Sequence, residues 1–295
     1  MKRFLPWLIR LAPLLLVAVC AILLVFLLQQ GLGSLSPTLL FGNVPPLQAI
    51  LGKAPVWEGL WPACAGTFCL VLLTQALALL PGLGCGIYLA EYASPKKAAT
   101  ISLAMDILAG TPSIVMGLFG FTLIVCLRQS FLPNANTSLL LSAACLSLLV
   151  LPVIVSSCCE ALRALPRDLR ITALALGLKK RTVVTRILLP QASQGLAAGL
   201  ILALARSAED TAVIMLTGAV ANAGLPAGLW DKFEALPFAI YYTAGEYQNA
   251  QDLTRGFGAA LLLLLLSILL VLIAHVLECR YLRQRQGTHA AGCSR

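Results

Sequence analysis

Residues 160–190 read EALRALPRDLRITALALGLKKRTVVTRILLP, and they place seven Lys and Arg side chains in the middle of a chain that is otherwise rich in Leu, Ala, Val and Ile. Pro166 suits the first turn of a helix and Asp168 complements the positive end of that helix, while Gly177 suits its end. The stretch therefore predicts a short helix outside the membrane, followed by a second, turn-rich basic piece that leads to Pro190.

The predicted helix has two distinct faces. At about 100° per residue, Leu169, Ala173 and Leu176 share one face. Arg167 and Arg170 share another. A basic loop lying against anionic membrane lipid would explain the charge, but it does not explain the spacing of the residues along the stretch.

The rest of the chain has the composition of an integral membrane protein. Of its 295 residues 59% are hydrophobic and 11% are charged, against about 25% charged residues in soluble domains. Several uncharged runs reach the roughly 20 residues that a helix needs to cross a bilayer, and the period-two alternation of a membrane β-barrel is absent. We predict an all-α protein with six spans near 11–28, 64–88, 100–126, 138–158, 191–218 and 257–278.

The net charge of +9 encodes topology rather than nucleic-acid binding. With the N-terminus inside and six spans, 16 of the 21 Lys and Arg residues fall in cytoplasmic segments, as the positive-inside rule requires. Both termini are then cytoplasmic, and the protein is a multi-pass protein of the cell (inner) membrane. The first span lacks a small-residue cleavage site, so we interpret it as a retained signal anchor. The glycine-rich run 211–230 is interpreted as a broken or re-entrant segment.

The residues needed for most enzyme chemistry are missing from the sequence. The ten Cys residues lie mostly inside apolar spans, and the only two His residues lie near the C-terminus, which leaves no metal site and no cofactor to expect. There is no HExxH or GxSxG motif for an intramembrane enzyme. There is also no GxxxxGK[ST] loop, so any ATP hydrolysis belongs to a separate chain.

The spacing in the basic stretch resembles the cytoplasmic signature loop of ATP-binding-cassette (ABC) importer permeases. In that family a Glu-Ala-Ala group is followed by three residues, a Gly, nine residues and then Ile-x-Leu-Pro. Here Gly177 and residues 187–190 match the latter part of this pattern. Residues 171–173, at the place of Glu-Ala-Ala, read Ile-Thr-Ala. The resemblance implies a coupling helix that docks in a cleft of the ATPase subunit. The coupling residues that it implies are Glu160, Ala161, Arg167, Arg170, Ala173, Gly177, Ile187 and Pro190.

Four further segments resemble the phosphate-type permeases, specifically their PstA-type subunit, in the same order along the chain. They are GIYLAEYA at 86–93, ILAGTPSIVMGLFG at 107–120, LPVIV and EALRALP within 151–166, and EALPFAIYYTA at 234–244. The resemblance implies the type I ABC importer fold, with an anchor helix and outward loop at 1–60, a permease core at 61–280 and a basic cytoplasmic tail at 281–295.

The function implied is that of a permease subunit of an ATP-driven importer of inorganic phosphate. The partners implied are a second permease subunit in a heterodimer, a cytoplasmic ABC ATPase dimer and an extracytoplasmic phosphate-binding protein. A permease for another oxyanion, such as molybdate or sulfate, stays open as an alternative, as does an intramembrane enzyme. A purely structural role would leave the coupling-loop spacing unexplained.

Charged residues within the fifth span are the candidates for the substrate path. The family pattern Arg-Ala-x-Gly-Glu-Thr-Ala is met here by RSAEDTA at 206–212. At 1.5 Å per residue Arg206 lies about 20 Å along the span, where an unpaired charge costs roughly 3 kcal/mol or more. Either Arg206 forms an internal ion pair with Asp210, or it lines the route of an oxyanion, which we prefer. The candidate path residues are Arg206, Glu209, Asp210, Thr211 and Asp106. Asp106 serves the same network or simply caps a break in the chain at residues 110–112, Gly-Thr-Pro.

Overall fold

The computed structural model describes residues 4–292 except 51, 53–55, 58, 131–135 and 227, and it is almost entirely helical. In this part of the chain the one β-type pairing is a bridge between Ala219 and Phe233. The long helices are α1 (Phe4–Gly31), α4 (Trp61–Ile87), α5 (Pro95–Gly110), α6 (Ser113–Ser130), α7 (Leu139–Arg163), α10 (Leu189–Glu209) and α13 (Ala250–Gly292). The short elements are η1 (Leu32–Ser34), α2 (Pro37–Phe41), α3 (Pro46–Ile50), η2 (Tyr88–Tyr92), α8 (Arg167–Ala175), α9 (Lys180–Val183), η3 (Val184–Leu188), α11 (Ala212–Thr217) and α12 (Leu236–Glu246). The predicted all-α class is confirmed.

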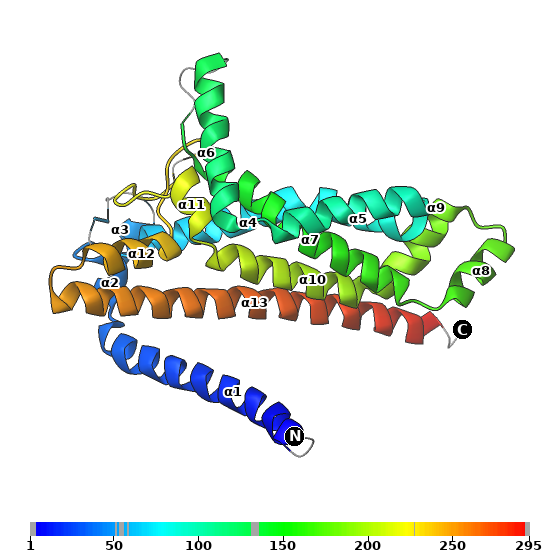
Figure 1. Ribbon diagram of the computed structural model, residues 1–295, viewed down its shortest axis with the longest axis horizontal. Helices are drawn as coiled ribbons and strands as arrows, with labels where there is room; N and C mark the ends of the chain where they lie inside the picture. Colours follow the sequence, from blue (N-terminus) through cyan, green and yellow to red (C-terminus); the bar gives the residue numbers. More distant parts are fainter. Residues whose placement is uncertain are drawn as a thin grey trace.

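The described residues contain six segments that are long and apolar enough to cross a membrane. They are Leu11–Ser34, Trp61–Tyr92, Ser113–Ser130, Leu139–Arg163, Lys180–Glu209 and Ala250–Arg280, which confirms the predicted number of spans. The first of them stands apart from the bundle and meets α13 where Phe26 packs edge-on against Phe257 (Figure 1). The start of α1 and the end of α13 both point toward the end of the bundle that holds α8 and α9 (Figure 1).

Helices α4, α7, α10 and α13 run side by side along the long axis of the molecule (Figure 1). Glycine permits the close approach of α4 to α7, because a Cβ added at Gly86 would lie 2.5 Å from Cβ of Cys158. On α10, Gly199 faces Ser157 of α7 in the same way. Small residues at helix crossings let the backbones come together, which is the usual source of packing energy between helices in lipid.

The predicted third span, 100–126, consists of two helices, and the break between them lies where it was expected, at residues 110–112. The chain forms α5 up to Gly110 and then a new helix, α6, from Ser113. Pro112 lies between them and has no N–H to continue the hydrogen-bond ladder, and the Thr111 hydroxyl donates instead to the carbonyl of Ile107 at 2.9 Å. Because of this break α6 leaves the bundle at a steep angle, while α5 stays against α7 (Figure 1).

The predicted fifth span, 191–218, is also interrupted. Helix α10 ends at Glu209, Asp210 takes up an extended conformation, and α11 starts at Ala212. Oδ1 of Asp210 accepts a hydrogen bond from the N–H of Val213 at 2.9 Å. An aspartate that caps a helix start in this way competes with continuation of the preceding helix, so the continuous helix was the wrong prediction.

Two glycines on α4 provide a test of the close helix packing. We expect Gly86→Ala to lower the free energy of unfolding by about 1–3 kcal/mol, because the new methyl group collides with Cys158 and with the backbone carbonyl of Val155. Gly84→Ala is the matched control, since no heavy atom lies within 4 Å of the Cβ it would add. Both are measured by thermal or denaturant unfolding in detergent; equal stability of the two variants would contradict the packing account.

Candidate functional site

Helix α8 forms the first part of the candidate site. It begins directly after Pro166 and ends at Ala175, and Gly177 follows with φ of +77°, the left-handed conformation that glycine adopts past a helix end. The N–H of Gly177 donates to the carbonyl of Leu174 at 2.9 Å. The predicted helix, with its proline start and glycine stop, is confirmed. It lies with α9 beyond one end of the bundle (Figure 1).

Arg170 of α8 is bound within this chain. Its Nε donates to Oε1 of Glu91 at 2.9 Å, and its Nη2 lies 2.8 Å from the same oxygen. Nη1 donates to the carbonyl of Leu165 at 3.0 Å, and Nη2 to the carbonyl of Leu162 at 2.6 Å. A guanidinium offers five N–H donors in a planar fork, so a single side chain ties α8 to both α7 and η2. We call these four residues the Arg170 clamp.

The turn η2 receives two more cations of the basic stretch. Nη2 of Arg163 donates to the carbonyl of Leu89 at 3.4 Å. Nζ of Lys180 lies 4.8 Å from the centroid of the Tyr92 ring, within the range of a cation–π interaction. Two segments that are far apart in sequence, GIYLAEYA and the basic stretch, therefore form one unit at this end of the molecule.

The outer surface of α8 is apolar but differs from the expected face. Ala173 is buried in a cluster with Val183 and Leu188 of the same chain, instead of facing outward. Ile171 and Leu174 are instead 64% and 50% exposed. Ala173 packs against the bundle, and at 100° per residue Ile171 lies about 160° and Leu174 about 100° around the helix from it. Burial of the Ala173 side therefore leaves Ile171 and Leu174 to solvent. We call Ile171, Leu174 and the exposed Leu176 the α8 surface.

The other expected coupling residues differ in their exposure. Glu160, Arg167 and Gly177 are exposed, whereas Ala161, Ile187 and Pro190 are half-buried. Pro190 lies in the first turn of α10, directly after η3, the π-helical turn Val184–Leu188.

The second part of the candidate site lies where the two helix breaks meet. Besides the Val213 N–H, the carboxylate of Asp210 is hydrogen-bonded to the hydroxyl of Ser113, the first residue of α6. Gly117 of α6 packs so closely on α11 that an added Cβ would lie 3.0 Å from the carbonyl oxygen of Ala212. The starts of α6 and α11 are therefore joined through one aspartate.

The expected path residues have different surroundings in the isolated chain. Arg206 and Glu209 are exposed on the last turn of α10, Thr211 is half-buried, and Asp106 is exposed one turn before the end of α5. Among the described residues, Arg206 lies in no ion pair of 4.0 Å or less. The i, i+4 ion pair with Asp210 is wrong for this structure, because α10 ends at Glu209 and the carboxylate caps α11 instead.

Sequence reasoning missed two residues of these sites. Glu91 holds Arg170, and Ser113 holds Asp210. Each lies within a segment that carries the family resemblance, GIYLAEYA or ILAGTPSIVMGLFG. Their presence in those segments was the available signal, but their partners lie far away in sequence.

A family model described as "Binding-protein-dependent transport system inner membrane component" matches residues 82–283, which is more than half of the chain. The chain belongs to this family. Its relatives include "Phosphate transport system permease protein PstA 1" of Mycobacterium tuberculosis, 32% identical over 229 residues that make up 77% of this chain and 72% of the relative. A PstA protein of Yersinia pestis is 30% identical over 253 residues, 84% of this chain and 80% of the relative.

The fold is that of a solved permease. The structure titled "Inward facing conformations of the MetNI methionine ABC transporter" aligns with a TM-score of 0.54 and 20% sequence identity, covering 82% of this chain and 99% of that one. The likeness shows a shared fold, and with the family it establishes a multi-pass membrane permease of the type I ABC importer class.

The Arg170 clamp predicts how firmly α8 is held in the permease. We expect Arg170→Gln to speed backbone amide exchange in residues 167–175 at least about tenfold, because charged hydrogen bonds each contribute about 1.5–3 kcal/mol. Arg167→Gln is the matched control, since this exposed arginine belongs to the same helix. Hydrogen exchange followed by mass spectrometry measures both. Exchange in Arg170→Gln that matches the control would show that the clamp does not hold α8.

Proposed function

We propose that this permease is the transmembrane subunit of an ATP-driven importer of inorganic phosphate, coupled to a separate ATPase. The observation that carries the proposal is the α8 surface: a helix outside the bundle, fixed by the Arg170 clamp, presents bare apolar side chains. Soluble proteins rarely leave such side chains together unless a partner covers them. The phosphate transport permeases among the relatives support the choice of substrate.

The ATPase partner is an ABC ATPase dimer on the cytoplasmic side. The sequence contains no phosphate-binding GxxxxGK[ST] loop, so ATP hydrolysis requires another chain. Glu160, Arg167 and Gly177 are exposed as well and are available for the proposed contact. The termini lie on the same side of the membrane, which the concentration of Lys and Arg in the basic stretch marks as the cytoplasm.

A second permease subunit completes the translocation path as a heterodimer. Large apolar side chains on α5 and α6, among them Leu103, Ile107, Leu118 and Phe119, are exposed in this chain. Arg206, Glu209 and Asp106 are exposed as well. A partner that packs against the apolar side chains would enclose these charged residues, and an extracytoplasmic phosphate-binding protein would deliver substrate from the other side.

Within that path Arg206 and Thr211 bind the oxyanion, with Asp210 shaping the site. Arg206 lies on the last turn of α10, about 25 Å along the helix from Leu189. A charge at that depth of the bilayer needs an anionic or aqueous partner. The Arg206 guanidinium matches a tetrahedral oxyanion through two parallel hydrogen bonds. The exposed carboxylates of Asp106 and Glu209 adjust the charge along the path.

The first test of this function is docking of the ATPase. We expect Leu174→Asp to reduce the amount of co-purified ATPase about tenfold or more, because a charge replaces an apolar contact at the centre of the α8 surface. Leu229→Asp is the control: that leucine is 49% exposed, close to the 50% of Leu174, but lies in the loop after α11. Undiminished co-purification with Leu174→Asp would exclude α8 as the docking element.

The second test concerns Arg206. We expect Arg206→Lys to lower phosphate uptake about tenfold, since it keeps the charge but loses the planar fork, and Arg206→Gln to abolish uptake while the complex still assembles. The double variant Arg206→Gln, Asp210→Asn should stay inactive, and its asparagine can still cap α11. Uptake into proteoliposomes is measured per assembled complex.

Recovery of uptake in that double variant would show that Arg206 serves only to balance Asp210.

The same proteoliposomes, supplied with binding proteins for molybdate or sulfate, test the alternative oxyanions. Uptake of either in place of phosphate would overturn the substrate assignment.

A further inference from the structure

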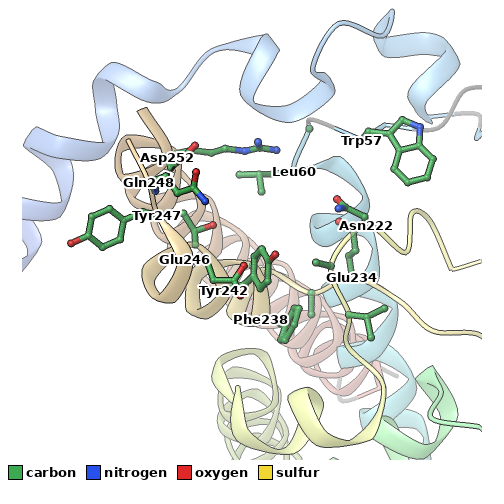
Figure 2. Close-up of a pocket in the computed structure, with 17 residues that line it drawn as sticks. Trp57, Leu60, Asn222, Glu234, Phe238, Tyr242, Glu246, Tyr247, Gln248 and Asp252 are labelled. Atoms are coloured by element: carbon green, nitrogen blue, oxygen red, sulfur yellow. Dashed lines mark hydrogen bonds between the residues drawn. The ribbon is translucent and has the colours of Figure 1, made fainter. Parts of the chain in front are cut away.

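A pocket of about 450 Å³ lies between the loop after α11, α12 and the start of α13, with Trp57 on its far side from Glu246 and Tyr242 (Figure 2). Helix α12 lies at the end of the bundle opposite α8 and α9 (Figure 1). If α8 is cytoplasmic, this pocket opens on the extracytoplasmic side. We call it the outer pocket.

The outer pocket carries an excess of negative charge. Among the described residues that line it, Glu234, Glu246 and Asp252 are acidic and Arg255 is basic. Burial raises the pKa of Glu234, although the N–H of Gly224 donates to its Oε1 at 2.8 Å and Arg255 opposes the shift. An oxyanion would be repelled here, so the pocket is not a subsite for the substrate.

The three carboxylates are held in place by neighbouring donors. Oδ2 of Asp252 accepts from the backbone N–H groups of Gln248 and Asn249 at 3.2 and 3.3 Å, which fixes the start of α13. The carboxylate of Glu246 raises the pKa of the neighbouring Tyr242 hydroxyl, one turn earlier on α12. The negative potential is therefore built into the fold before any ligand arrives.

Aromatic rings complete the lining. The rings of Phe238 and Tyr242 stack with centroids 6.2 Å apart, and both line the pocket together with the exposed Trp57 and Tyr247. Aromatic faces attract cations and also cover the apolar stem of a long basic side chain. Exposed Trp and Tyr at the mouth of a pocket are typical of the residues that dominate protein–protein binding energy.

We propose that the outer pocket receives a lysine or arginine side chain of the extracytoplasmic binding protein when that protein docks. The proposal rests on the proposed function, because it needs such a partner. Fixed carboxylates beside aromatic rings complement a cation with an apolar stem. The partner that would supply this cation is the binding protein on which the family depends, as its description states. In the described residues, no group of three or more His, Cys, Asp or Glu side chains is arranged to hold a metal ion, which favours an organic cation.

The test is the affinity of a phosphate-binding protein for the whole transporter complex in nanodiscs. We expect Glu246→Gln to weaken binding about tenfold, mainly through slower association, and to make it less sensitive to salt. Glu246→Lys should weaken it further. Asp231→Asn is the matched control. It removes an exposed carboxylate from the loop after α11, and that carboxylate does not line the pocket, so this variant should bind as the wild type does.

The possible outcomes are distinguishable. If the wild-type complex binds no phosphate-binding protein, the proposed function is wrong. If the wild type binds and both Glu246 variants bind equally well, the pocket proposal is wrong while the function stands. Loss of the second permease subunit from the Glu246→Lys complex would instead assign the pocket to that subunit and overturn the proposal.

Discussion

The hydrogen bonds of the Arg170 guanidinium hold together the end of the molecule that carries α8 and α9. The guanidinium has four contacts with three acceptors: the Glu91 carboxylate and the carbonyls of Leu162 and Leu165. Glu91 is only 8% exposed, so an unpaired carboxylate there would be costly. Pairing with Arg170 removes that cost and fixes the rotation of α8 about its own axis. The rotation in turn decides which side chains form the α8 surface.

The clamp also connects α8, the docking element in our proposal, to the membrane helices. Glu91 belongs to η2, the turn between α4 and α5, and α5 leads directly to the break before Ser113. Asp210 joins that break to the end of α10. If the ATPase docks on α8 as we propose, these contacts connect its docking site to α5 and α10. In our proposal these are the elements that carry the substrate path.

Local chemistry in the sequence predicted the elements whose signals lie within a few residues of each other. Pro166 and Gly177 correctly bounded α8, and the length of the apolar runs gave the number of spans. Pro112 likewise marked the break between α5 and α6. The same reasoning failed at Asp210, where we gave the apolar run more weight than the capping aspartate. The run of apolar residues is the stronger pattern, but it does not report whether the backbone hydrogen bonds continue.

Long-range pairs could not be predicted from one sequence. Arg170 and Glu91 are 79 residues apart. Helical periodicity placed Leu169, Ala173 and Leu176 on the apolar face of α8, but it did not show which side of the helix would be buried. For the same reason Arg170 was expected to contact the ATPase, whereas its donors are used within the chain.

A double-mutant cycle on the clamp tests the central claim most directly. ATPase affinity is measured for complexes carrying Arg170→Gln, Glu91→Gln or both. If Arg170 acts by orienting α8, each single change weakens the ATPase to a similar extent and the double variant is no worse than either. If Arg170→Gln weakens binding while Glu91→Gln does not, Arg170 contacts the ATPase itself and the account is contradicted.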